Sequence, residues 1–236
     1  MRKLKNHFLN KKYLSFKSFY ILKNDFKIIF EYLDNNNIKL ENKKIIDIAC
    51  GNASFTNFMK KKYPNNKYFG LDKDRKLIAL NRKNKSLKDV KFYCQSCENK
   101  ISNKKFDIIT MLGTLGLFKN QKKIINNLLK NLNKGGILII NAYLNNNNID
   151  IDIKYRKFFN KKTFLKNSIF IKSFQDTKNF LKKKTSKLVI KKNNIPFKIK
   201  RSKNNMNIYT SKLNGHLVRT SDLNIIYDQF LIIAKK

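Results

Sequence analysis

KKIIDIACGNASFTNFMKKKYPNNKYFGLD, residues 43–72, is the stretch that decides the fold, because it predicts a strand, a tight turn, a helix and a second strand. Residues 43–50 contain a short apolar run rich in β-branched residues, which is typical of a strand buried on both faces of a parallel sheet. Gly51 and its small neighbours break the run, so the backbone can turn sharply and pass close to a ligand. Apolar positions at helical spacing follow, and a ligand would lie at the start of that helix.

The second strand of this unit ends on an acid. Residues 67–72 place Asp72 at the carboxyl end of the strand, 21 positions after Gly51. A carboxylate in that position can accept hydrogen bonds from both hydroxyl groups of a ribose. The unit therefore predicts a site for a ribose between the turn and the acid.

Two families share this architecture, and the glycine pattern separates them. A dinucleotide-binding fingerprint needs G-x-G-x-x-G, whereas residues 49–53, ACGNA, retain one glycine. The stretch resembles instead the first motif of class I S-adenosylmethionine-dependent methyltransferases, acid-x-G-x-G-x-G, with Asp47 as the acid and Gly51 as the middle glycine. Ala49 and Ala53 stand where glycines are usual, and alanine is tolerated there if its backbone angles are not left-handed.

The resemblance extends over residues 43–143. Residues 73–80 predict a helix under the cofactor and resemble the family's second motif, and residues 90–94 predict a third strand. The family usually follows this strand with an acid that holds the adenine amino group. Ser96 stands in that place here, so the resemblance assigns the adenine contact to the Ser96 hydroxyl or to the Cys97 backbone.

FDIITML, residues 106–112, resembles the family's central strand, which ends beside the methyl donor. Met111 and Leu112 could cover one side of the adenine and shield the sulfonium, although ordinary core packing is an equal alternative. LNKGGILIINAY, residues 132–143, resembles the family's glycine turn after a helix and its fifth strand. The resemblance implies S-adenosylmethionine as the cofactor and the following cofactor-binding residues: Asp47, Ala49, Cys50, Gly51, Asn52, Asp72, Lys73, Ser96, Cys97, Met111 and Leu112.

These elements predict an α/β fold, namely a Rossmann-like, seven-stranded, mainly parallel sheet with helices on both faces and an antiparallel C-terminal strand. We expect one domain over residues 1–236, with an N-terminal helical lid (1–40), a cofactor-binding core (41–144) and a substrate-side insertion with closing strands (145–236). Two helices are expected in the lid, where Tyr13 and Tyr20 either cover the cleft or serve plain core packing.

The amino-acid composition limits the classes of partner and the cellular compartment that we expect. The formal net charge of +38 favours polyanions such as nucleic acid, but the lysines are spread over every segment, so a solvated surface is favoured over a nucleic-acid face. No apolar run approaches the ~20 residues of a membrane span. Three cysteines cannot pair completely, which indicates a reducing, cytoplasmic compartment. Cys94 and Cys97 lack the second pair that a structural zinc site needs, so no metal is expected.

The last third of the chain has to select the substrate. Residues 206–210 and 224–233 predict antiparallel strands that close the sheet. The layout resembles methyltransferases encoded with surface-polysaccharide genes, which implies a glycan precursor or another small molecule as the acceptor. NIPF, residues 194–197, imitates the Asn-x-Pro-aromatic motif of adenine-N6 methyltransferases, but it follows the fifth predicted strand instead of the fourth.

Methyl transfer from a sulfonium is an in-line displacement, so the site mainly needs alignment and a dry cleft. The candidates for a base or for substrate contacts are His216, Tyr155 and Arg156. Each has an alternative without a role in catalysis. His216 is also readily explained as a loop histidine without a role, and Tyr155 and Arg156 could be structural.

Two alternatives to a small-molecule methyltransferase stay open. The net charge supports an RNA methyltransferase, which the unclustered lysines oppose. The two replaced glycines and the missing adenine acid allow a degenerate methyltransferase fold that serves as a binding module.

Overall fold

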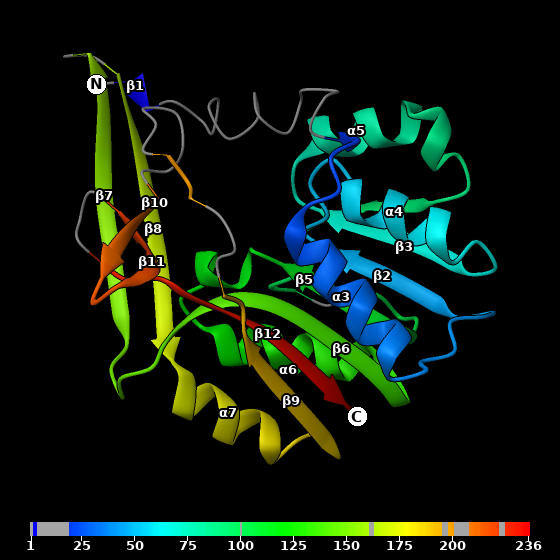
Figure 1. Cartoon of the computed structure of the whole chain (residues 1–236). Helices are drawn as coiled ribbons and strands as arrows, with labels where there is room; N and C mark the ends of the chain where they lie inside the picture. Colours follow the sequence, from blue (N-terminus) through cyan, green and yellow to red (C-terminus); the bar gives the residue numbers. More distant parts are fainter. Residues whose placement is uncertain are drawn as a thin grey trace.

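Parallel strands joined by helices form the centre of the protein in a computed structural model of the chain (Figure 1). The structure describes residues 2–3, 19–99, 101–160, 163–194, 198–200, 208–221 and 225–236, with the backbone alone for 2–3, 156–160, 163–167 and 208. The elements in chain order are β1 (Arg2–Lys3), α3 (Asn24–Asn35), β2 (Lys44–Ile48), α4 (Ser54–Lys62), β3 (Lys67–Asp72), α5 (Arg75–Lys83), η1 (Lys85–Leu87), β4 (Lys91–Cys94), β5 (Phe106–Leu112), η2 (Leu115–Leu117), α6 (Gln121–Asn131), β6 (Leu132–Asn145), β7 (Ile151–Asn160), β8 (Thr163–Ser173), α7 (Phe174–Lys182), β9 (Lys187–Lys192), β10 (Ile208–Leu213), β11 (His216–Ser221) and β12 (Asp228–Lys235).

The predicted seven-stranded sheet is present as the core of a larger one. Its strands lie in the order β4-β3-β2-β5-β6-β12-β9. The first five strands of this order are parallel, and β12 is antiparallel to both of its neighbours. This arrangement confirms the Rossmann-like, mainly parallel sheet and its antiparallel C-terminal strand. Among the described residues, β1, β7 and β8 extend the sheet beyond the carboxyl end of β6.

Helices cover both faces of the sheet, as predicted. One apolar cluster joins α6 and α7 to the sheet through residues such as Ile124, Leu128 and Leu181. The other joins α3 and α4 to the opposite face through residues such as Ile29 and Met59. The parallel strands between these layers are buried on both sides, which explains why their sequences are continuous apolar runs.

Gly70 lets β3 approach β4 closely. A Cβ atom at this position would lie 2.6 and 2.7 Å from two ring carbons of Phe92 and 3.1 Å from the Cys50 sulfur. We therefore expect Gly70→Ala to lower the free energy of unfolding by about 1–3 kcal/mol, because an inserted methyl group overpacks the core. Denaturant titration should detect this loss. Gly70→Ala should destabilise the Phe92→Leu variant less than it destabilises the wild type, because leucine leaves room for the added methyl group. Strictly additive effects would contradict the assignment to this contact.

The closing strands differ in part from the prediction. The strand expected at 224–233 corresponds to β12, which closes the main sheet. The strand expected at 206–210 corresponds to β10, but β10 pairs with β11 in a separate two-stranded sheet, so its expected role in closing the main sheet is wrong. The reason is the turn at Asn214 and Gly215, whose positive φ angles of 48° and 78° form a tight hairpin.

Two further expectations concern segment ends. Gly135, in the expected glycine turn, has a left-handed conformation with a φ of 74°. It lies inside the irregular start of β6 instead of in a separate turn, because α6 ends at Asn131 and β6 begins at the next residue.

Of the predicted N-terminal helices, α3 lies within the described residues, and Tyr13 lies outside them. None of the described helices combines the length and the apolar character needed to cross a membrane.

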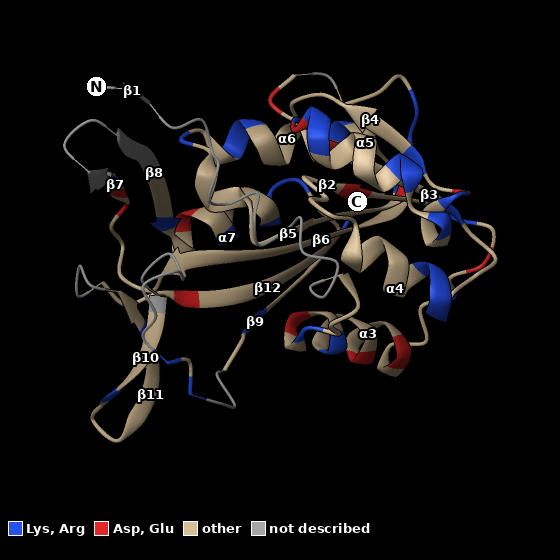
Figure 2. Cartoon of the chain, turned by 90° about the horizontal axis from the view of Figure 1, so that it is seen from above, with Lys and Arg blue, Asp and Glu red and all other residues tan. Residues whose placement is uncertain are grey.

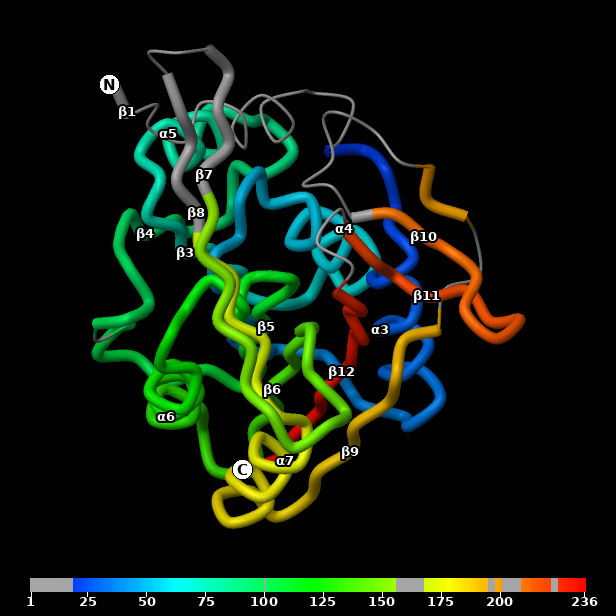
Figure 3. Tube along the Cα trace, turned by 90° about the vertical axis from the view of Figure 1, so that its left-hand side faces the viewer, coloured from blue at the N-terminus to red at the C-terminus, as the bar shows by residue number. Residues whose placement is uncertain are grey.

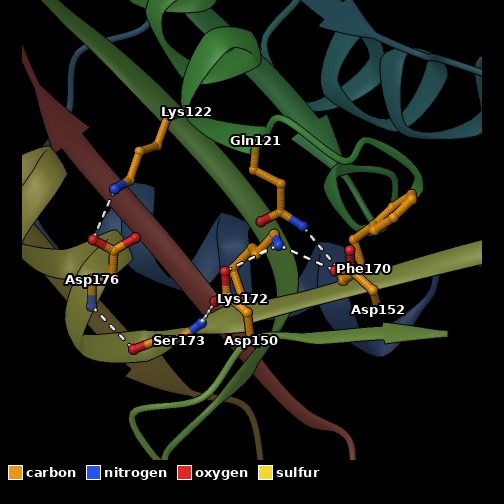
Figure 4. A network of polar contacts seen from close by, with 8 residues as sticks. All are labelled: Gln121, Lys122, Asp150, Asp152, Phe170, Lys172, Ser173 and Asp176. Carbon is orange, nitrogen blue, oxygen red and sulfur yellow. Dashed lines mark hydrogen bonds and ion pairs between the residues drawn. The ribbon is translucent and has the colours of Figure 1, made fainter.

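A polar network attaches the β7–β8 hairpin to the core (Figure 4). The Lys172 ammonium of β8 lies 3.0 Å from the Asp150 carboxylate and 3.2 Å from that of Asp152. The buried Gln121 side chain, at the start of α6, donates to the carbonyl oxygen of Phe170 at 2.8 Å. The hairpin stands on the side toward which β2 and β3 point (Figures 1 and 3). It is therefore attached to the core on the side where the carboxyl ends of the parallel strands lie.

Candidate functional site

The chain bends sharply between β2 and α4. Alternate residues of this bend, Ala49, Gly51 and Ala53, have left-handed backbone angles, with φ values of 56°, 57° and 55°. The Cys50 N–H donates to the carbonyl oxygen of Leu71 on β3 at 3.0 Å, which ties the bend to the neighbouring strand. The backbone thus runs past the carboxyl ends of β2 and β3.

The two alanines of the bend depart from expectation. They were expected to be tolerated where backbone angles are not left-handed, yet both adopt the left-handed conformation. This conformation costs an ordinary residue roughly 1–2 kcal/mol, because its Cβ crowds the carbonyl oxygen. The bend keeps the shape that three glycines would give it, so contacts elsewhere in the fold must offset the free-energy cost of the two left-handed alanines.

Ala49→Gly is expected to raise the free energy of unfolding by about 0.5–1 kcal/mol. Removing the left-handed strain gains more than the extra entropy of glycine in the unfolded chain costs. Ala53→Gly is the matched comparison, since Ala53 is fully buried in the core and also loses a packed methyl group, worth about 0.8 kcal/mol. Chemical denaturation should show a gain for Ala49→Gly only. Equal effects at both positions would contradict this account.

The Asp72 carboxylate faces the bend. Its Oδ2 accepts the Gly51 N–H at 2.9 Å, and its Oδ1 accepts the Asp74 N–H at 2.9 Å. The residue is half-buried, and a carboxylate offers about four acceptor positions, so two remain for a ligand. Asn52 is also half-buried at the bend, and the neighbouring Lys73 is exposed.

Asp47 is a buried acid directly beneath the bend. It is 5% exposed, and its two carboxylate oxygens accept the hydroxyls of Thr110 at 2.8 Å and Thr56 at 3.3 Å. Burial raises the pKa of Asp47 to about 7, against the lowering effect of the two hydroxyl hydrogen bonds, and the Asp72 charge raises it further. A cation placed at the bend would therefore find a carboxylate that is poised to lose its proton near neutral pH.

Three supporting residues were not identified from the sequence. Thr110 faces Asp47 because β2 and β5 pair in that register. The Asn81 side chain donates to the Gly51 carbonyl oxygen at 2.8 Å, and Asp74 caps α5. Asp74 had a readable signal, since an acid just before a helix is a common N-cap. The other contacts depend on strand register and helix packing, which the sequence does not show.

The predicted adenine side lies next to the end of β4. The Ser96 hydroxyl is within 3.3 Å of the Glu98 carboxylate and accepts the Glu98 N–H at 3.2 Å, whereas Cys97 is buried. Burial raises the pKa of the Cys97 thiol to about 11. Met111 is fully buried in the cluster beneath α6, so its side chain packs in the core, and half-buried Leu112 lies on the opposite face of β5.

The three catalytic candidates lie on two hairpins, with Tyr155 and Arg156 on β7 and His216 on β11. His216 is exposed and begins β11 directly after the hairpin turn, so the expected loop histidine belongs to a strand. Tyr155 of β7 packs against a small apolar cluster formed by Ile153, Ile171 and Tyr227. Arg156 also lies in β7, where the structure describes its backbone.

A buried amide near the end of β5 was also missed. Asn141 of β6 is 2% exposed, and its side-chain oxygen has no hydrogen-bond partner among the described residues. Asn141 is paired with Leu112 in the sheet, two residues beyond the level of Thr110. Because side chains alternate along strands, Asn141 projects on the same face as Thr110 and Asp47. An unpaired buried acceptor is costly, so a ligand donor would be bound favourably there.

Comparison with known proteins places this geometry in a family. A family profile described as a methyltransferase domain matches residues 39–211. The malonyl-[acyl-carrier protein] O-methyltransferase of Bacillus cereus is 24% identical over 100 residues, which cover 42% of this chain and 37% of that protein. The match thus spans less than half the length of this relative.

Solved structures show the same fold. An S-adenosylmethionine-dependent methyltransferase from Clostridium acetobutylicum has 16% identity and a TM-score of 0.58, covering 96% of this chain and 97% of that one. The magnesium protoporphyrin IX methyltransferase of Synechocystis, determined with bound S-adenosylmethionine, has 12% identity and a TM-score of 0.54, covering 90% and 78%.

Proposed function

The chain belongs to the family of S-adenosylmethionine-dependent methyltransferase domains, and we propose that it methylates an oxygen or nitrogen atom of a small molecule or a glycan precursor. The observation that carries this proposal is the contact between Asp72 and the Gly51 N–H, which turns a half-buried carboxylate toward the left-handed bend. The free thiols of Cys50, Cys94 and Cys97 fit the cytoplasmic compartment expected from the sequence.

The residues of the bend fit the proposed cofactor. The two remaining acceptor positions of Asp72 match the two hydroxyls of a ribose. Residues 49–53 are small in the main, and three of them have left-handed φ angles, so the bend takes the shape that glycines favour. Asp47 supplies a negative charge below the bend that complements a cationic ligand.

The bound cofactor supplies a methyl group on a positively charged sulfur, and the chain's part is alignment. Asp72 and Gly51, joined by their hydrogen bond, would hold the nucleoside end of the cofactor. Leu112, at the end of β5, offers an apolar surface that excludes water from the reacting atoms. We place the acceptor over the end of β5 and the neighbouring part of β6, where the unpaired oxygen of Asn141 can accept a hydrogen bond from the acceptor's N–H or O–H group.

Titration calorimetry with S-adenosylmethionine and S-adenosylhomocysteine tests the cofactor assignment. We expect saturable one-site binding of both ligands. No heat at millimolar ligand would contradict the proposal and favour the binding-module alternative, in which the altered bend no longer accepts a nucleoside.

RNA is the second candidate acceptor, and the net charge of +38 favours it. Lys and Arg positions occur on α4, α5 and α6 as well as near β10, so they are distributed over several elements (Figure 2). Filter binding at two salt concentrations separates the cases. Uniform weak RNA binding with a steep salt dependence would indicate charge alone, whereas salt-resistant binding of a defined RNA would replace the small-molecule acceptor.

A further inference from the structure

A cavity lies at the amino ends of the parallel strands, away from the Gly51 bend at their carboxyl ends. Its volume is about 470 Å³, and its walls come from the end of α3 and the loop after it, the starts of β5 and β6, β9 and the end of β12. Asp107 at the start of β5 lines it, whereas Leu112 ends the same strand beside the bend. At about 3.3 Å per residue, the strand separates the two regions by roughly 16 Å.

The cavity has an apolar floor and an open wall of backbone. The apolar side chains that line it are Ile38, Leu40, Ile108, Ile137, Val189 and Ile233. Gly135 forms part of the wall in a left-handed conformation, and no atom lies within 4 Å of the position that its Cβ would take. A flat or aliphatic group could therefore rest on the floor without displacing a side chain at this wall.

Lysines surround the floor. Lys39, Lys43, Lys134, Lys187 and Lys235 all line the cavity. None of these ammonium groups forms an ion pair within the described part of the chain, although six lysine–carboxylate contacts occur elsewhere in it. The unneutralised positive charge favours an anion at the rim.

The acid in the lining does not neutralise these lysines. The Asp107 carboxylate accepts the Lys44 N–H at 2.8 Å and the Asn133 side-chain amide at 2.7 Å. These contacts hold the starts of β2 and β6, and the single charge of Asp107 can offset at most one of the five lysines. The cavity keeps a positive rim above an apolar floor, and this combination distinguishes it from the lysine-rich outer surface.

We propose that this cavity binds a small organic anion with an apolar body, such as an aryl or alkyl carboxylate, sulfonate or phosphate. The volume lies in the usual range for sites that enclose a small molecule. An inorganic anion would leave the floor unused, a neutral apolar compound would leave the lysines unpaired, and a nucleic-acid strand would contact the rim alone. The site is independent of methyl transfer, because it lies at the other ends of the strands.

The test uses 8-anilinonaphthalene-1-sulfonate as the probe, with saturating S-adenosylhomocysteine present so that the Gly51 region is occupied. Fluorescence titration should show one site whose affinity falls with added salt. The uncharged N-phenyl-1-naphthylamine and inorganic phosphate serve as comparison ligands. We expect each to bind at least about tenfold more weakly than the sulfonate, a difference of about 1.4 kcal/mol. The uncharged amine can contact only the apolar floor, and phosphate can contact only the lysines.

Two variants locate the bound probe. Lys134→Glu/Lys187→Glu should weaken sulfonate binding by about tenfold or more, and Val189→Trp should do so by filling the floor. Lys88→Glu/Lys119→Glu, which reverses two exposed lysines outside the cavity, is the matched control and should leave the affinity unchanged. Circular dichroism and thermal melts check the fold of each variant. If Lys134→Glu/Lys187→Glu does not fold, Lys134→Gln/Lys187→Gln takes its place in the titration. Equal affinity in the cavity and control variants, or equal binding of the sulfonate and its uncharged analogue, would overturn the proposal.

Discussion

Asp72→Ala is expected to weaken the binding of S-adenosylmethionine and S-adenosylhomocysteine by about a hundredfold or more. Hydrogen bonds to a charged acceptor contribute about 1.5–3 kcal/mol each, and a hundredfold change in affinity corresponds to about 2.8 kcal/mol. The carboxylate would make two such bonds to a ribose, and it also holds the Gly51 N–H at 2.9 Å. The variant loses both the ligand contacts and the brace of the bend.

The control for Asp72→Ala has to separate ligand contacts from a disturbed bend. Asp72→Asn keeps the size of the side chain and one acceptor oxygen while it removes the charge, so it should bind with intermediate affinity. Asp89→Asn changes the same charge on an exposed residue paired with Lys60 and should leave binding unchanged. The wild type should prefer adenosine over 2′-deoxyadenosine in calorimetric titrations, and Asp72→Ala should lose that preference. A preserved preference would show that the ribose is held elsewhere.

The sequence was most informative where local patterns determine structure. The apolar runs identified the strands β2, β3 and β5 because parallel strands are buried on both faces, and the spacing of Gly51 and Asp72 located the bend. Strand alternation alone could not show that Met111 faces the α6 layer and Leu112 the other one, because both faces of the sheet are apolar. The same ambiguity concealed the partnership of Asp47 with Thr110.

Turn chemistry and backbone angles set the other limits. Asn214 and Gly215 form a recognisable hairpin signal, and reading it would have placed His216 in a strand. The left-handed angles of Ala49 and Ala53 had no such signal, since alanine rarely adopts them. Tertiary contacts impose them, among which are the hydrogen bond from Asn81 to Gly51 and the burial of Ala53.

Asp47→Asn is expected to change how stability depends on pH. Burial raises the pKa of Asp47 in the folded protein to about 7 from an ordinary value of 3.8, so the folded state holds a proton that the unfolded state has already lost. The free energy of unfolding should therefore fall as pH rises from about 4 to about 7, and stay level above that. The total change from this group is at most about 4 kcal/mol, at 1.36 kcal/mol per pKa unit.

The asparagine variant should lack this decline. Its amide oxygen can accept one hydroxyl, its amide N–H can donate to the other, and neither titrates, so Asp47→Asn should become more stable relative to the wild type between pH 5 and pH 8. Asp89→Asn is the reference, because its hydrogen bond to Lys60 lowers the pKa of the wild-type carboxyl and leaves its charge constant over that range. Urea denaturation at several pH values measures both differences. Parallel curves for the wild type and Asp47→Asn would show that Asp47 is already ionised at pH 5.

The same carboxyl group should link cofactor affinity to pH. A ligand cation above the bend stabilises the ionised form of Asp47, so bound S-adenosylmethionine would lower the pKa of this group below about 7. Binding must then release a proton, and affinity should rise with pH by as much as tenfold per unit until about pH 7. Titrations in buffers of different ionisation enthalpy count the released proton. Asp47→Asn should release none and bind with an affinity that does not change over this range, whereas a pH-independent wild type would mean that the cation of the ligand lies away from Asp47.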